Sequence, residues 1–119
     1  MPSNLIIIEK NNALKNPREF HRPLYLHLMQ RVSIKLRISG KVQGVYYRGS
    51  TKTKAEELGL CGWVKNEKNG DVSAVVEGPK EQVEQLVAWC AEGPTMARVD
   101  HIERKTGPLQ HFDNFRILR

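Results

Sequence analysis

The chain of 119 residues is predicted to fold as an α+β protein, with an antiparallel sheet that carries two helices on one face. Two kinds of observation lead to this fold class. Several short segments alternate apolar and polar residues, as strands with one buried face do. Helical segments lie between them, so that the order is strand, helix, strand, strand, helix, strand, and then a short terminal strand.

The first strand is predicted over residues 33–38 (SIKLRI). Its apolar residues Ile34, Leu36 and Ile38 occupy every second position and therefore share one face. The polar residues between them face the other side, as in a half-buried strand. Residues 40–47 are predicted to form a loop, because this segment contains glycines and leads towards a helix.

A helix is predicted over residues 49–58, and Gly59 stands directly after it, where glycine commonly ends a helix. Residues 60–66 (LCGWVKN) are predicted to form the second strand. The Asn-Gly pair that follows at positions 69 and 70 is a strong hairpin signal, because both residues tolerate the positive φ angles of a type I′ turn. The third strand is therefore predicted over residues 71–77.

The second helix is predicted to start at Pro79, since proline suits the first turn of a helix. Its apolar residues follow the spacing i, i+3, i+4 and i+7 and form one stripe: Val83, Leu86, Val87 and Cys90. Strands are then predicted over residues 97–105 and 112–118. Because each helix has one apolar face, both are expected to cover the same side of the sheet, in a ferredoxin-like βαββαβ sandwich.

Residues 1–29 differ from the rest of the chain. After a short aliphatic run this segment is polar, is interrupted by Pro17 and Pro23, and shows no sustained periodicity. We therefore expect a flexible N-terminal extension over residues 1–29 and a folded domain over residues 30–119. A mis-assigned start codon, with the true beginning near Met29, is the alternative explanation.

The composition is that of an ordinary globular protein, with 39% hydrophobic and 27% charged residues. The longest aliphatic run, residues 5–8 (LIII), is too short for a membrane span or a signal peptide, so we expect a cytoplasmic protein. Cys61 and Cys90 lack metal-ligand spacing and are interpreted as thiols in a reducing compartment, with a disulfide between them as the alternative. The net charge of +6 is spread along the chain, which favours a solvated basic surface plus a local anion site.

Residues 40–54 (GKVQGVYYRGSTKTK) contain the most informative pattern. Gly40 and Gly44 allow main-chain conformations closed to other residues and let N–H groups approach a ligand closely. A loop that leads into a helix N-terminus can surround a phosphate with such groups, and Arg48 adds a planar fork of donors matched to phosphate oxygens. The pattern thus predicts a phosphate site, and a solvated surface arginine after a glycine-rich turn is the alternative interpretation.

Two motifs carry a family resemblance. Residues 38–48 (ISGKVQGVYYR) resemble the first signature of the acylphosphatases, and residues 62–66 (GWVKN), with glycines following at positions 70 and 78, resemble the second. The resemblance covers about residues 30–119. It implies an enzyme that hydrolyses the carboxyl-phosphate bond of acyl phosphates to a carboxylate and orthophosphate, by in-line attack of water and without a metal or cofactor.

The resemblance also implies roles for single residues. By position, Arg48 resembles the phosphate-binding arginine of the family and Asn66 its water-orienting asparagine. The loop whose N–H groups surround the phosphate corresponds to Gln43, Gly44, Val45, Tyr46 and Tyr47. Two residues depart from the family pattern. Tyr47 replaces a phenylalanine and brings a hydroxyl that needs a partner, while Gly49 is expected to loosen the first helical turn and the hold on Arg48.

Such chemistry needs few catalytic groups. A carboxylate leaves easily, and the loose transition state of phosphoryl transfer responds mainly to positioning and charge stabilisation. The amide of Asn66 can hold a water molecule but cannot act as a base, and the resemblance implies that a phosphate oxygen takes the proton. The histidines have no metal-ligand spacing, so no metal site is expected: His21, His27, His101 and His111.

We expect a monomer that acts on small-molecule acyl phosphates, with no nucleic acid and no membrane partner. A non-catalytic phosphate- or RNA-binding module of the same fold is the alternative, given the basic charge. RNA-binding modules stack bases on aromatic residues of the sheet, whereas the polar-face positions of the first and third strands carry none: Ser33, Lys35, Arg37, Ser73, Val75 and Glu77. A second alternative is the acylphosphatase-like domain of a larger carbamoyl-transferring enzyme.

Overall fold

The computed structural model describes residues 30–119, of which Arg31–Arg119 form one compact unit. The extension expected over residues 1–29, with His21 and His27, lies outside the described residues. The elements follow the predicted order: β1 (Arg31–Lys41), α2 (Tyr47–Glu57), β2 (Cys61–Asn66), β3 (Val72–Pro79), α3 (Lys80–Cys90), β4 (Arg98–Gly107) and β5 (Phe115–Leu118). Neither helix within residues 30–119 is long and apolar enough to cross a membrane.

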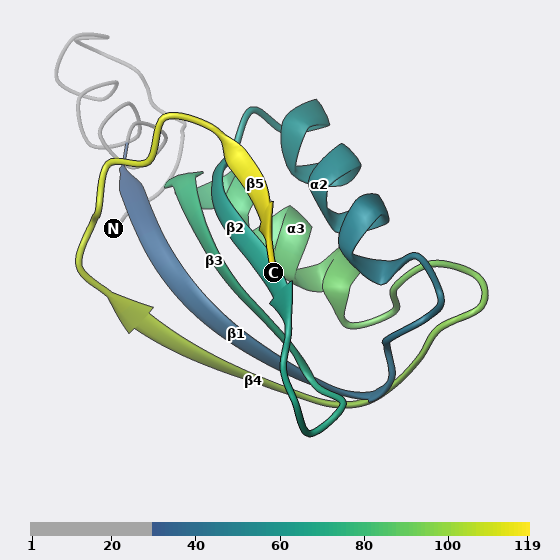
Figure 1. The fold of residues 1–119 in the computed structure, drawn as a ribbon. Coiled ribbons are helices and arrows are strands. Elements are labelled where there is room, and N and C mark those ends of the chain that lie inside the picture. The colour runs from purple at the N-terminus through teal and green to yellow at the C-terminus, as the bar shows by residue number, and fades with distance from the viewer. Residues whose placement is uncertain (1–29) are drawn as a thin grey trace, which may run out of the picture. The chain divides into compact units, whose positions relative to one another are not determined.

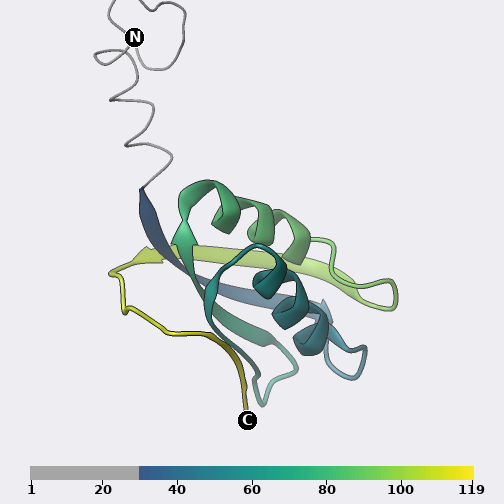
Figure 2. The same ribbon diagram turned by 90° about the horizontal axis from the view of Figure 1, so that it is seen from above.

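The strands form one five-stranded sheet in the order β4-β1-β3-β2-β5 (Figure 1). The four strands of the βαββαβ unit are antiparallel neighbours, as predicted. The terminal strand β5 instead runs parallel to β2, so the complete sheet is mixed. Both helices lie on one side of this sheet (Figure 2), which confirms the predicted ferredoxin-like fold class.

The core lies between the helices and the sheet. Ile34, Leu36 and Ile38 are all buried, as the alternation in the first strand predicts. The predicted stripe of α3 is also buried and packs into the same cluster. Tyr47 joins the two helices, because its buried hydroxyl donates a 2.6 Å hydrogen bond to the main-chain oxygen of Cys90. Both cysteines are free, which excludes the disulfide left open as an alternative.

Helix α2 begins at Tyr47, two residues before the predicted start, and ends at Glu57, one residue before the predicted end. Its N-cap residue Tyr46 has a left-handed conformation with φ of 63°. The helix begins early because the side chain of Tyr47 is buried in the core. At the other end Gly59 has φ of +72° and its N–H binds the oxygen of Glu56, while the N–H of Leu60 binds that of Ala55. This pair of bonds is a Schellman motif, which needs glycine at that position.

The helix-free face of the sheet carries alternating polar residues and one aromatic residue. Trp63 pairs with Val75 across β2 and β3, so it lies on the same face as Lys35, which pairs with Val75 from β1. The ammonium of Lys65 lies 5.7 Å from the centre of the Trp63 ring. The sequence prediction for this face considered only the first and third strands, so it did not include Trp63 on β2.

Strand β5 is held in place through the connection that precedes it. The carboxylate of Glu77 on β3 is almost completely buried and accepts hydrogen bonds from the main-chain N–H groups of Gln110, His111 and Phe112. Burial alone would raise the pKa of Glu77, but these N–H donors outweigh it and hold the pKa below its usual value. The bonds fix the β4–β5 connection against the sheet and so direct β5 along β2.

Candidate active site

The predicted phosphate loop connects β1 to the first turn of α2. Gly44 has φ of 76° and Tyr46 follows with φ of 63°, so the chain turns sharply before the helix begins. None of the main-chain N–H groups from Gln43 to Gly49 donates to an acceptor within residues 30–119, and the N-cap residue provides no side-chain bond. Unpaired N–H groups next to a helix N-terminus favour an anion, because they add to the positive end of the helix dipole.

The loop is held from the side of the β2–β3 turn. The side-chain amide of Gln43 donates to the main-chain oxygens of Glu67, at 2.7 Å, and of Asp71, at 2.8 Å. Arg37 in turn donates a 2.8 Å bond to the Asp71 carboxylate, and this bond lowers the pKa of that carboxyl group. The side chain of Gln43 therefore anchors the loop and does not point to a ligand, while Val45 packs against the core.

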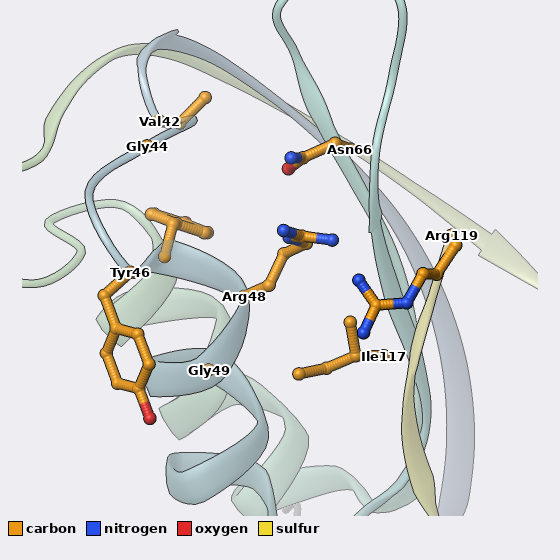
Figure 3. Close-up of a pocket in the computed structure, with 9 residues that line it drawn as sticks. Val42, Gly44, Tyr46, Arg48, Gly49, Asn66, Ile117 and Arg119 are labelled. Atoms are coloured by element: carbon orange, nitrogen blue, oxygen red, sulfur yellow. The ribbon is translucent and has the colours of Figure 1, made fainter.

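A hollow of about 350 Å³ opens where this loop, the end of β2 and the end of β5 meet. It is lined by Val42, Gly44, Tyr46, Tyr47, Arg48, Gly49, Asn66, Ile117 and Arg119. Of the seven residues predicted for the site, five line the hollow, whereas Gln43 and Val45 do not. Figure 3 shows that the polar ends of Arg48, Asn66 and Arg119 converge in it.

Arg48 stands in the first turn of α2 and reaches into the hollow between Asn66 and Arg119 (Figure 3). Within the described part of the chain its guanidinium has no ion pair and no hydrogen bond to a side chain. No aspartate or glutamate side chain lines the hollow, so no acidic side chain in it neutralises this charge. The arrangement suits a small anion with several oxygens, for which a guanidinium provides a planar fork of donors.

Asn66 is the last residue of β2, and its side chain turns towards Arg48 (Figure 3). Its Oδ1 atom is buried and has no hydrogen-bond partner among residues 30–119. Leaving a buried acceptor unpaired costs about 1–3 kcal/mol. An acceptor kept in this state beside a guanidinium has the chemistry needed to hold a water molecule in the hollow.

The two departures from the family pattern have structural reasons. The Tyr47 hydroxyl finds its partner in the main-chain oxygen of Cys90, and burial raises its pKa far above the usual value, so it stays a donor. Gly49 makes room for the Tyr46 ring, since a Cβ atom at Gly49 would lie 2.5 Å from Cζ of that ring. The ring itself is 75% exposed and points away from the Arg48 guanidinium (Figure 3).

The sequence prediction missed Ile117 and Arg119. Phe115, on the same strand, is buried in the core, and alternation puts Ile117 and Arg119 on the same side. The parallel register pairs Lys65 with Leu118, so that continuing it by one residue sets Arg119 beside Asn66. The ending FRILR carries this alternation, but only the pairing of β5 with β2 reveals that it meets the site.

No group of three or more His, Cys, Asp and Glu side chains within residues 30–119 is arranged to hold a metal ion. The polar groups that meet in the hollow are amides and guanidiniums, which are donors and a neutral acceptor. This donor set fits an anion and not a hard cation, which prefers carboxylate oxygens.

Comparisons with known proteins show the family of this chain. The family model described as Acylphosphatase matches residues 34–117. The acylphosphatase of Marinobacter nauticus is 52% identical over 82 residues, which cover 68% of this chain and 89% of that protein. The acylphosphatase of Acaryochloris marina is 47% identical over 88 residues, covering 74% and 95%. The solved structure of an acylphosphatase from Coxiella burnetii superposes with a TM-score of 0.72 at 40% identity, covering 74% of this chain and 93% of that one.

Proposed function

The chain belongs to the acylphosphatase family and hydrolyses the carboxyl-phosphate bond of acyl phosphates, and on this basis we propose that Arg48 and Asn66 are its catalytic residues. In this proposal the loop N–H groups and Arg48 bind the phosphoryl group, and Asn66 positions the attacking water. The substrates are small-molecule acyl phosphates.

Binding of the phosphoryl group rests on two sets of donors. The unpaired main-chain N–H groups belong to the loop and the first helical turn beside the hollow, and the Arg48 guanidinium reaches into the hollow (Figure 3). The transition state spreads negative charge over the equatorial oxygens of the phosphoryl group, and donors already fixed in place stabilise that charge without reorganising. The anchor from Gln43 to the β2–β3 turn keeps the loop in this arrangement.

The attacking water is held by Asn66. Its unpaired Oδ1 accepts a hydrogen bond from the water, and this bond orients a lone pair of the water oxygen towards phosphorus. An amide cannot remove the proton, so the proton passes to a phosphoryl oxygen as the new bond forms. Holding the water in line with the phosphorus lowers the entropy cost of bringing the two reactants together.

The observation that carries the proposal is the unpaired, buried Oδ1 of Asn66 in the same hollow as Arg48. A surface arginine alone has many explanations, and a glycine-rich turn before a helix is common. A buried acceptor without a partner is costly in a folded protein, and a water that pairs with Oδ1 after a small turn of the amide towards the hollow removes this cost.

The test is release of orthophosphate from benzoyl phosphate, measured with chelator present. Arg48→Gln is expected to raise KM and to lower kcat at least a hundredfold, because the charge acts in both the ground state and the transition state. Asn66→Ala is expected to lower kcat by a similar factor while KM changes little. Lys52→Gln is the matched control, since it removes a charge from the same helix outside the hollow. Full activity of Asn66→Ala would contradict the water-positioning role.

We further propose that residues 30–119 form the catalytic domain and that residues 1–29 are an extension that catalysis does not need. The family model matches residues 34–117, which lie inside the proposed domain and support this division. A chain that begins at Met29 should keep kcat/KM within twofold of the full chain. A large loss of activity on removal of residues 1–28 would contradict it.

A monomer in the cytoplasm is proposed as the working state. The free thiols support a reducing compartment, and burial raises the pKa of Cys90 to about 12, so that this thiol stays neutral and unreactive. Large exposed apolar side chains within residues 30–119 are Tyr46, Met96 and Leu109, which come from separate segments. Light scattering tests the oligomeric state, and a mass of two chains at micromolar concentration would exclude the monomer.

A further inference from the structure

The hollow contains a second guanidinium, from Arg119, that phosphoryl binding does not account for. It enters from β5, on the other side of Arg48 from the Asn66 amide (Figure 3). Within residues 30–119 this side chain has no ion pair. Its placement follows from the pairing of β5 with β2 and from the alternation that buries Phe115.

The hollow is larger than a phosphoryl group requires. A water molecule takes about 30 Å³ in the liquid, so the five heavy atoms of a phosphate need on the order of 150 Å³ at that density. The hollow measures about 350 Å³, which leaves room for the attacking water and for the first atoms of the acyl group. Two guanidinium groups and no acidic side chain line this space, so the part beyond the phosphoryl group also favours an oxygen anion.

We propose that Arg119 stabilises the carboxylate that leaves during hydrolysis, a role that rests on the assignment of Arg48 and Asn66 above. In this reaction the bond between phosphorus and the acyl oxygen breaks, and its electron pair stays on that oxygen. A new bond forms from the water oxygen to phosphorus, and the water proton moves to a phosphoryl oxygen. The acyl group is neutral at first and becomes a carboxylate, whose two oxygens match the fork of a guanidinium.

The proposed role of Arg119 is catalytic because the negative charge on the leaving carboxylate forms only during the reaction. The interaction is weak while the acyl oxygens are uncharged and becomes strong only as the carboxylate forms, so it lowers the barrier more than it strengthens binding. The stabilisation must also depend on the acid. A more basic carboxylate holds more concentrated charge at the transition state and gains more from a nearby cation.

The test compares the full chain with Arg119→Gln on a series of benzoyl phosphates whose substituents vary the pKa of the leaving acid. We expect kcat to fall about tenfold for the unsubstituted substrate, less than for a fully buried donor because Arg119 is exposed. The loss should increase with the pKa of the acid. The inhibition constant for orthophosphate should change less than threefold. Arg116→Gln removes the same charge from the opposite face of β5 and should leave all these values unchanged.

Three results would overturn the inference. Equal losses for all leaving groups, together with weaker inhibition by orthophosphate, would make Arg119 a phosphate ligand. A rise in KM confined to acyl groups with a second carboxylate, such as succinyl phosphate, would make it a binding site for that carboxylate. Unchanged kinetics would give it no role. Arg48→Gln is measured in parallel, since its full activity would overturn the site itself, whatever Arg119 does.

Discussion

At the level of single residues, Tyr47 joins the two helices directly behind the site. Its ring is buried and lies 5.9 Å from that of Trp89, and its hydroxyl donates to the main-chain oxygen of Cys90. Arg48 is the next residue, so the side chain that fixes the start of α2 also fixes the origin of the guanidinium that we propose to be catalytic.

Replacing Tyr47 with phenylalanine tests this link. Tyr47→Phe leaves the Cys90 oxygen without its side-chain donor in a buried place, and we expect the free energy of unfolding to fall by about 1–2 kcal/mol. Urea denaturation measures the change. Tyr46→Phe is the matched control, because that side chain is exposed and has no side-chain hydrogen bond among residues 30–119. Equal stability of the two variants would contradict the role of the buried bond.

The first turn of α2 contains Gly49, which is a poor helix former. Alanine would stabilise this turn by about 1 kcal/mol, but its Cβ would collide with the Tyr46 ring. Because that ring is exposed, it can rotate away at little cost. Gly49→Ala should therefore raise the free energy of unfolding by roughly 0.5–1 kcal/mol in urea denaturation. If it lowers stability while Tyr46→Ala/Gly49→Ala does not, the ring position is more rigid than we infer.

At the level of elements, β5 brings two residues into the hollow and is itself held by Glu77. The buried carboxylate binds three successive N–H groups of the β4–β5 connection. A short edge strand has few hydrogen-bond partners of its own. The hydrogen bonds to the Glu77 carboxylate, which we call the Glu77 clamp, therefore determine how firmly Ile117 and Arg119 are held in the hollow. The clamp connects stability to pH.

Glu77→Gln should lower the free energy of unfolding by about 2–3 kcal/mol at pH 7, because the variant loses charged hydrogen bonds. The pKa of Glu77 in the folded state lies below the ordinary value of 4.5. The carboxylate therefore stabilises the fold fully above that ordinary value, and its contribution is lost as the pH falls through the folded pKa. The difference between wild type and variant should thus disappear at acid pH. The exposed Glu92→Gln is the control, and a pH-independent difference would contradict the clamp.

At the level of the whole molecule, local patterns predicted most of the fold because each element satisfies its own rules. The alternation in β1, the stripe of α3 and the glycine after α2 all act within a few residues. The parallel pairing of β5 with β2 involves residues about 50 positions apart, and no local pattern encodes it. Ile117 and Arg119 were missed for that reason.

The predicted site shows the same division. Arg48 and Asn66 come from two motifs that are specific in sequence, and the fold brings both into one hollow. Gln43 was expected to offer its main-chain N–H to the phosphate, and this stays a prediction; its side chain, for which no role was predicted, anchors the loop to the β2–β3 turn. Binding and rate measurements test the proposed chemical roles of Arg48 and Asn66.

The central claim is that a cradle of main-chain N–H groups and the Arg48 guanidinium binds a phosphate dianion. Titration of the protein with orthophosphate, followed by isothermal calorimetry, tests it most directly. Wild type and Asn66→Ala should bind with affinities within threefold of each other, whereas Arg48→Gln should bind at least tenfold more weakly, a loss of about 1.4 kcal/mol. Binding by Arg48→Gln as strong as that of wild type would contradict the account.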